Sequence, residues 1–408
     1  MQDLACFNAF SEILVKLDNF DVIEIRPKEK TLEKAFFGDY DFLYNPKIFQ
    51  DIFELFFTVC KSHKISFRLS QRAFKKRITM YDFDKEIVFE FWPHIELKHK
   101  NKFTYIQWNS LSGYILDTSK QKHLIEIFSA IYITHLYFKN KKIESDEVRY
   151  RLNFYISQLA DNSDSQDLIR YLRNILDTNF VSHNANALAI KFLVNKKIIP
   201  ESIFLANIHI NLKRINQKLG MRNVIPIIGP DGSGKTTLIK HLDYSNLRFK
   251  NLFRTSLTYK MIIKLNKPSL NSKNLIDEKI LIYIQMISLI KINLLRISRG
   301  FFKKRYLMDR YFYDYLSLGI RNNDIPLKII PGYKIIAKFI PRPRKLILLS
   351  CSNDILRLRK DELTKDSIDS LYKIYTRIIV NQKISDVIII SCENSITENA
   401  RLAKSFLN

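Results

Sequence analysis

The sequence is poor in glycine, with nine glycines in 408 residues. Glycine adopts positive φ angles more readily than any other residue and lets the backbone approach a ligand closely. Three of the nine, Gly229, Gly232 and Gly234, fall within six residues of each other. This concentration in a glycine-poor chain singles out one loop as the candidate site.

Long uncharged hydrophobic runs are also absent. No stretch of about 18 residues is free of charged side chains, so the sequence predicts no membrane-spanning helix. The first residues, Met1-Gln2-Asp3, do not have the basic and apolar pattern that begins a signal peptide. We therefore expect a cytoplasmic protein.

Cysteine is scarce, and its four positions are Cys6, Cys60, Cys351 and Cys392. Their spacing matches neither a metal site nor a redox motif. We expect four reduced thiols that pack as small apolar residues.

Acidic residues are outnumbered by basic ones, 41 to 66, which gives a net charge of +25 and a pI near 9.7. Such an excess suits an anionic partner, for example a nucleic acid or a membrane surface. The cations are spread along the chain with short clusters only, so a solvated basic surface is the other interpretation. Weak binding to anionic polymers stays open, as does a homodimer.

The length predicts two or three domains. Residues 1–120 mix strand and helix patterns, as in an α+β domain, and residues 121–219 are helical throughout. After a boundary at 220–223, residues 222–408 alternate strand and helix, which favours a parallel sheet. The predicted fold class is α/β.

Periodicity predicts the individual elements. Strands are expected at 21–26, 38–44, 65–69, 76–81, 87–92, 224–228, 306–308, 345–349 and 386–391. Helices are expected at 3–17, 46–63, 121–139, 146–160, 164–177, 185–196, 200–219, 275–299, 353–360, 367–383 and 396–407.

The glycine cluster lies between an apolar run and a helical pattern, in the motif Gly229-x-x-x-x-Gly234-Lys235-Thr236. Strand, glycine loop and helix are the context of a phosphate-binding loop, whose inward N–H groups bind phosphate oxygens. Lys235 would reach the β- and γ-phosphates of ATP, and the Thr236 hydroxyl would bind Mg²⁺. The predicted ATP-binding residues are Gly229, Asp231, Gly232, Ser233, Gly234, Lys235, Thr236 and Thr237.

Two further motifs suit phosphoryl transfer. The apolar run 306–308 ends in Asp309, and an acid at that place can hold Mg²⁺ opposite the loop. The adjacent Arg310 could bind a phosphate of the acceptor. Arg357 and Arg359 belong to a basic segment that could close as a lid and neutralise charge on the transferred phosphoryl group.

Together these motifs, the glycine loop, Asp309-Arg310-Tyr311 and the basic segment 357–360, resemble those of thymidylate kinases and their relatives. The resemblance covers residues 222–408. It implies a P-loop kinase fold with a five-stranded parallel sheet, ATP and Mg²⁺ as the donor system, and transfer to a nucleoside monophosphate such as dTMP. It also implies that Asp231 and Arg310 face the acceptor, that Asp309 faces the metal, and that residues 357–360 form the lid.

Two departures concern the acceptor. The family's Arg-Glu-Pro-Gly-Gly-Thr stretch is reduced to a single arginine in residues 253–257. Its thymine-holding Ser-Ser-x-Ala-Tyr-Gln pattern is replaced by Phe-Tyr-Asp-Tyr-Leu at 312–316. A site without the matching polar groups does not select thymine strongly, so the acceptor need not be dTMP.

In the N-terminal part, Asp39 and Asp41 in one predicted strand and Glu90 in another resemble the acidic pattern of minimal nucleotidyltransferases. Three such carboxylates could hold two Mg²⁺ ions for attack on a nucleotide α-phosphate. The Gly-Ser or Gly-Gly that precedes the acids in that family is missing, and two surface aspartates beside an edge-strand glutamate are the alternative. The sequence thus leaves two alternatives to the nucleoside monophosphate kinase: a sugar or polyol kinase coupled to a nucleotidyltransferase, and a nucleic-acid-associated P-loop NTPase.

Overall fold

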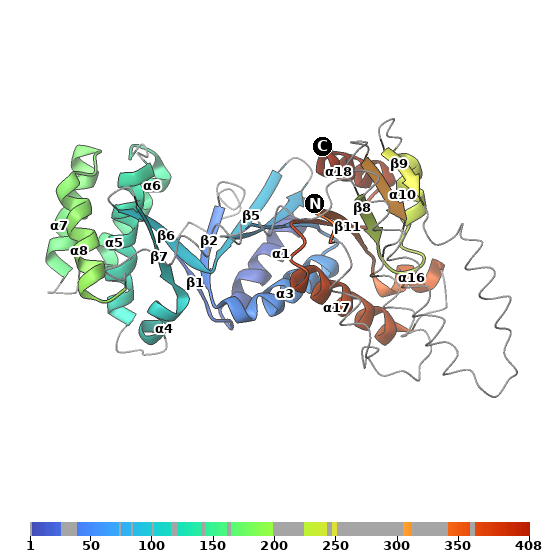
Figure 1. Cartoon of the computed structure of the whole chain (residues 1–408), viewed down its shortest axis with the longest axis horizontal. Coiled ribbons are helices and arrows are strands. Elements are labelled where there is room, and N and C mark those ends of the chain that lie inside the picture. The colour runs from blue at the N-terminus through green and yellow to red at the C-terminus, as the bar shows by residue number, and fades with distance from the viewer. Residues whose placement is uncertain are drawn as a thin grey trace, which may run out of the picture.

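The computed structural model describes residues 2–25, 39–72, 75–82, 85–99, 102–115, 121–139, 143–160, 165–198, 224–242, 247–250, 305–309, 311, 313, 342–359 and 364–408. The chain is mixed α/β. Figure 1 shows an elongated arrangement in which three parts follow one another along the long axis. No helix within the described residues is long and apolar enough to cross a membrane.

The central part contains α1 (Gln2–Leu17), β1 (Val22–Glu24), β2 (Asp39–Tyr44), η1 (Pro46–Ile48), α3 (Phe49–Ser62), β3 (Ser66–Gln71), β4 (Lys76–Asp82) and β5 (Lys85–Trp92). One end of the molecule contains β6 (His94–His99), β7 (Lys102–Gln107), α4 (Trp108–Ile115), α5 (Gln121–Lys139), α6 (Asp146–Leu159), α7 (Gln166–Thr178) and α8 (His183–Asn195). The other end contains β8 (Val224–Ile228), α10 (Lys235–His241), β9 (Leu247–Lys250), β10 (Arg305–Asp309), β11 (Lys345–Ser350), α16 (Asn353–Arg359), α17 (Lys365–Asn381), β12 (Asp386–Ser391) and α18 (Ile396–Leu407).

These elements agree with the expected ones to within a few residues wherever the structure describes them. The β6–β7 hairpin, α4 and the four-residue strand β9 were not predicted. β9 is too short to carry a periodic signal, and its backbone is held by parallel pairing with β10. The helices expected at 200–219 and 275–299 lie outside the described residues.

Ten of the described strands form one sheet in the order β1-β2-β5-β4-β3-β12-β11-β8-β10-β9. The five strands from β12 to β9 pair in parallel throughout. At the junction, β12 pairs antiparallel with β3, for example Val387 with Leu69. The predicted segments 1–120 and 222–408 are therefore parts of one continuous sheet, although 121–219 separates them in the chain.

β8, β11 and β12 are buried along nearly their whole length, as expected for strands covered by helices on both sides. Successive residues of β12 alternate between two hydrophobic clusters, with Val387 in one and Ile388 in the other. The second cluster includes buried residues of α10 and α18. The first includes α1, α3 and α17 and extends without a break across the β12–β3 junction.

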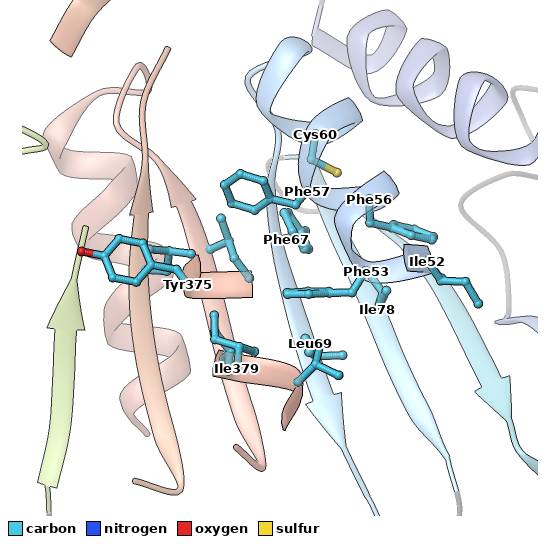
Figure 2. Close-up of a cluster of buried hydrophobic side chains, with 14 of the residues drawn as sticks. Ile52, Phe53, Phe56, Phe57, Cys60, Phe67, Leu69, Ile78, Tyr375 and Ile379 are labelled. Atoms are coloured by element: carbon cyan, nitrogen blue, oxygen red, sulfur yellow. The ribbon is translucent and has the colours of Figure 1, made fainter. Parts of the chain in front are cut away.

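The first cluster joins the two halves of the chain in one hydrophobic core. Figure 2 shows Tyr375 and Ile379 of α17 beside the aromatic side chains of α3 and β3. The rings of Phe57 and Tyr372 are 5.1 Å apart between centroids, and both side chains are buried. Each of the two helices therefore buries part of the apolar face of the other.

The helical end packs as a third cluster around α5, α6, α7 and α8. It reaches the large sheet through Leu43 and Ile25, and the Tyr155 hydroxyl donates to the Ile25 carbonyl (2.8 Å). The helical part thus covers the sheet near β1 and β2, far from the glycine loop (Figure 1).

Candidate functional site

The glycine loop connects β8 to α10 at the carboxyl end of the parallel strands. Gly229 has a φ of 148°, and a Cβ there would lie 3.0 Å from the Leu349 carbonyl oxygen. Gly234 precedes α10 with a φ of 89°, in the left-handed region that side chains disfavour. The turn is therefore compatible with glycine at these two positions and strained for other residues.

Lys235 is buried inside this loop, with 6% of its surface exposed. Its Nζ donates to the carbonyl oxygens of Gly229 (2.7 Å) and Pro230 (2.8 Å) and lies 3.9 Å from Asp231 Oδ1. A lysine in this place brings its positive charge to the centre of the loop predicted to bind phosphate. These two contacts hold the ammonium inside the loop.

Asp309 lies beside the loop because β10 pairs in parallel with β8 and ends at the same edge of the sheet. The Thr236 hydroxyl donates to Asp309 Oδ2 (3.1 Å). Asp309 is 5% exposed, and its buried Oδ1 has no hydrogen-bond partner among the residues that the structure describes. Leaving a buried carboxylate oxygen unsatisfied costs about 1–3 kcal/mol or more, so this arrangement suits a cation ligand.

The donor set beside the loop also fits Mg²⁺. One carboxylate and one hydroxyl are hard oxygen ligands, and Mg²⁺ commonly takes few protein ligands and completes its shell with water and phosphate oxygens. In the described ranges, no group of three His, Cys, Asp or Glu side chains is placed to hold a metal ion by itself. Thr236 and Asp309 are thus suited to a metal that arrives with a phosphate group.

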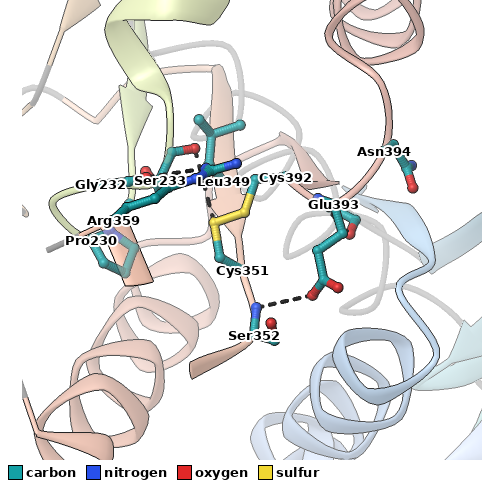
Figure 3. Close-up of a disulfide and its surroundings, with 12 residues drawn as sticks. Pro230, Gly232, Ser233, Leu349, Cys351, Ser352, Arg359, Cys392, Glu393 and Asn394 are labelled. Atoms are coloured by element: carbon teal, nitrogen blue, oxygen red, sulfur yellow. Dashed lines mark hydrogen bonds between the residues drawn. A yellow bond between two sulfur atoms is a disulfide. The ribbon is translucent and has the colours of Figure 1, made fainter. Parts of the chain in front are cut away.

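The predicted lid residue Arg359 reaches the loop from α16. Its Nη1 donates to the Gly232 carbonyl oxygen (3.2 Å), as Figure 3 shows. Arg357 and Arg359 are both exposed. The structure thus brings Lys235 and Arg359 to the same loop, while Arg310 and residues 360–363 lie outside the described residues.

A disulfide lies directly under the loop, between Cys351 and Cys392 (Figure 3). Each cysteine follows its strand by one residue, and the strand ends Ser350 and Ser391 are in register. Cys351 Sγ is 3.9 Å from the Ser233 carbonyl oxygen. The prediction of four reduced thiols is wrong for this pair. The two cysteines are 41 positions apart in the chain and become neighbours because β11 pairs with β12.

We expect two thiols, Cys6 and Cys60, to react in denaturant without reductant, and four after reduction. Reducing the disulfide, or replacing both bridged residues by serine, should lower the free energy of unfolding by about 2–4 kcal/mol, because the closed loop restricts the unfolded chain. Thiol titration and urea unfolding measure these two effects. Four reactive thiols before reduction would contradict the disulfide.

The three N-terminal acids come together on one face of the sheet, because Asp41 of β2 and Glu90 of β5 are register partners. Glu90 pairs with Lys75. Arg77 lies 4.0 Å from Glu90 Oε1 and 3.9 Å from Asp39 Oδ1. Burial raises the pKa of Glu90, and this effect exceeds the lowering by Lys75. The carboxylates thus form an ion-paired cluster with two cations, an arrangement that does not fit a pair of metal ions.

Trp92 adds to this cluster from β5, since its Nε1 donates to Asp41 Oδ1 (3.0 Å). Polar partners from neighbouring strands therefore engage all three predicted acids. A nucleotidyltransferase activity at Asp39, Asp41 and Glu90 stays a prediction that the contacts do not favour.

No protein-family model matches the sequence, and no curated protein matches it. Among solved structures, the chain is similar to a thymidylate kinase from Candida albicans, with 16% identity, a TM-score of 0.36, and coverage of 45% of this chain and 90% of that chain. It is also similar to a deoxyadenosine kinase from M. mycoides, with 15% identity, a TM-score of 0.34, and coverage of 45% and 98%. At these values the similarity does not decide the function.

Sequence reasoning missed Cys351, Cys392 and Glu393 at this edge of the sheet. A signal for the pair was present, because both apolar strand patterns end in the same dipeptide, Ser-Cys. Two parallel strands that end alike at one edge of a sheet bring those endings together. Glu393 had no such signal, because its carboxylate accepts a hydrogen bond from the Ser352 amide, and that contact depends on how the chain folds.

Proposed function

We propose that the chain is an ATP- and Mg²⁺-dependent phosphotransferase whose site lies at the loop Gly229–Gly234. The observation that carries this proposal is the contact of Thr236 with Asp309 beside the loop that encloses Lys235. The second carboxylate oxygen of Asp309 is buried and has no hydrogen-bond partner within the described part of the chain. Carboxylate, hydroxyl and buried ammonium together match what a magnesium–triphosphate requires.

Each residue has a separate task in this proposal. Lys235 exchanges its carbonyl partners for phosphate oxygens, and Thr236 and Asp309 hold the metal. Arg359 lies at the rim of the loop, where a guanidinium can bind a phosphate oxygen in place of the Gly232 carbonyl. When bound, Mg²⁺ supplies charge neutralisation for the phosphates.

For the acceptor we propose a nucleoside monophosphate, as the motifs implied. Asp231, which the motifs predict to face the acceptor, has its Oδ1 3.9 Å from Lys235 Nζ. The altered stretch at 312–316 argues against strict selection of thymine. A sugar or polyol is the competing acceptor class.

The test incubates the full chain with γ-labelled ATP and Mg²⁺ against a panel of nucleoside monophosphates, sugars and polyols. We expect labelled product with at least one nucleoside monophosphate. Asp309→Asn keeps the size of the side chain and removes its charge, and should lower kcat/KM by roughly 100-fold or more through weaker metal binding. Activity should then depend on a higher Mg²⁺ concentration.

Three results would count against this function. The first is no labelled acceptor together with no affinity for ATP and Mg²⁺. The second is an Asp309→Asn variant as active as the wild type. The third is ATP hydrolysis that appears only with DNA or RNA and falls steeply with salt, which would favour the nucleic-acid-associated NTPase instead.

A further inference from the structure

The first turn of α16 is held by a lysine from the N-terminal half of the chain. Lys61 lies in the last turn of α3, and its Nζ donates to Asn353 Oδ1 (3.0 Å) and pairs with Asp369 Oδ1 (3.2 Å). Asn353 begins α16 and also donates to Asp369 (3.2 Å). The side chain of Lys61 is 16% exposed and that of Asp369 is 45% exposed, so the cluster is partly shielded from water. A residue of α3 thus completes a polar cluster at the start of α16.

A second lysine acts on the same turn through Glu393. Lys64 Nζ lies 2.9 Å from Glu393 Oε2, and Glu393 Oε1 accepts a hydrogen bond from the Ser352 amide (3.1 Å), immediately before α16. Figure 3 shows this bond beside the disulfide. The Glu393 side chain is 8% exposed. Burial alone would raise the pKa of Glu393, but the hydrogen bonds from Lys64 and Ser352 outweigh it and lower the pKa.

Within the described residues, α16 follows Cys351, which the disulfide fixes, and its further attachments are these contacts at its first turn, one buried side chain and the contact of Arg359. It contains seven residues, of which only Leu356 is buried, and Leu358 is 87% exposed. A helix this short is not stable by itself and takes its orientation from its attachments. Its last residue, Arg359, contacts the Gly232 carbonyl of the phosphate-binding loop.

We propose that Lys61 and Lys64 are positioning residues for Arg359, so that the N-terminal half of the chain controls the basic helix of the phosphotransfer site. This proposal rests on the proposed function. Without the two lysines, the first turn of α16 is released and Arg359 spends less time at the loop. Lys235 is untouched, so ATP still binds, and the loss appears in kcat.

The test compares Lys61→Met/Lys64→Met with the wild-type full chain. We expect hydrogen exchange of the amides of residues 356–359, measured without ATP, to become about tenfold faster as the helix opens more often. We expect kcat to fall about tenfold, with KM for ATP changed less than about twofold, because the lost interaction acts on the transferred group. Exchange measured without ATP keeps this test separate from that of the proposed function.

Two controls isolate the charges. Lys64 has a φ of 61°, and arginine and methionine carry the same Cβ, so the backbone strain is equal in both variants. Lys61→Arg/Lys64→Arg should therefore restore exchange and kcat. Lys16→Met removes an exposed lysine paired with Glu12 inside α1, and should change neither.

The ion pair between Lys64 and Glu393 allows an independent experiment. Lys64→Met leaves a buried carboxylate without its cation, whereas adding Glu393→Gln removes that charge and keeps an acceptor for the Ser352 amide. The double variant should therefore recover part of the kcat lost in Lys64→Met. Unchanged exchange in Lys61→Met/Lys64→Met, or faster exchange with an unchanged kcat, would overturn the proposal. A wild-type chain without transfer activity would contradict the proposed function. The exchange measurement would still test whether the two lysines hold α16.

Discussion

Replacing Lys235 with alanine should abolish ATP-dependent phosphoryl transfer while the fold survives. The variant removes the ammonium that donates to the Gly229 and Pro230 carbonyl oxygens inside the loop. Loss of a preorganised charge at a developing transition-state charge lowers kcat by roughly 100- to 1,000-fold. The effect on stability is smaller, about 1–3 kcal/mol, because two buried carbonyls lose their donor.

The measurement is kcat/KM for the acceptor found in the screen, with the unfolding transition followed by circular dichroism. Lys240→Ala is the matched control, because Lys240 is an exposed lysine of the same helix, α10. It should leave both rate and stability close to wild type. A Lys235→Ala enzyme that keeps the wild-type rate would remove the assignment of the loop.

Much of the parallel part of the fold follows from local sequence pattern. Val224–Ile228, 346–349 and 387–390 are continuous apolar runs, as strands buried on both faces must be. The glycine loop and Asp309 were also predictable together, since both follow an apolar strand and parallel strands end at a common edge. Their contact through Thr236 agrees with that reasoning.

The junction between the halves could not be predicted in this way. Ser66–Gln71 and Asp386–Ser391 each read as ordinary strands, and no local pattern states that residues more than 300 positions apart will pair. The same limit applies to the contact of Lys64 with Glu393. Each of these depends on which strands become neighbours, a property of the assembled sheet.

The pairing of β12 with β3 leads to the second prediction with a large expected effect. A fragment that contains only residues 222–408 should fail to fold to a soluble monomer, although its sequence reads as a complete α/β domain. Tyr372, Tyr375 and Ile379 of α17 are each at most 2% exposed in the whole chain, and they share a core with α3 and β3. Exposing three such side chains costs about 1.5–3 kcal/mol each. That sum is comparable with the ~5–15 kcal/mol that stabilises a typical domain.

The fragment would also expose the free edge of β12, a row of unpaired backbone groups beside an apolar surface, and such an edge promotes aggregation. Soluble yield, size-exclusion chromatography and binding of a hydrophobic dye would report the outcome. Co-expression with residues 1–219 is the decisive control, because it restores β3 and α3 without restoring chain continuity. Rescue by that partner would attribute the failure to the shared sheet and core. A 222–408 fragment that is monomeric and unfolds cooperatively by itself would show that β12 and α17 do not need the N-terminal half.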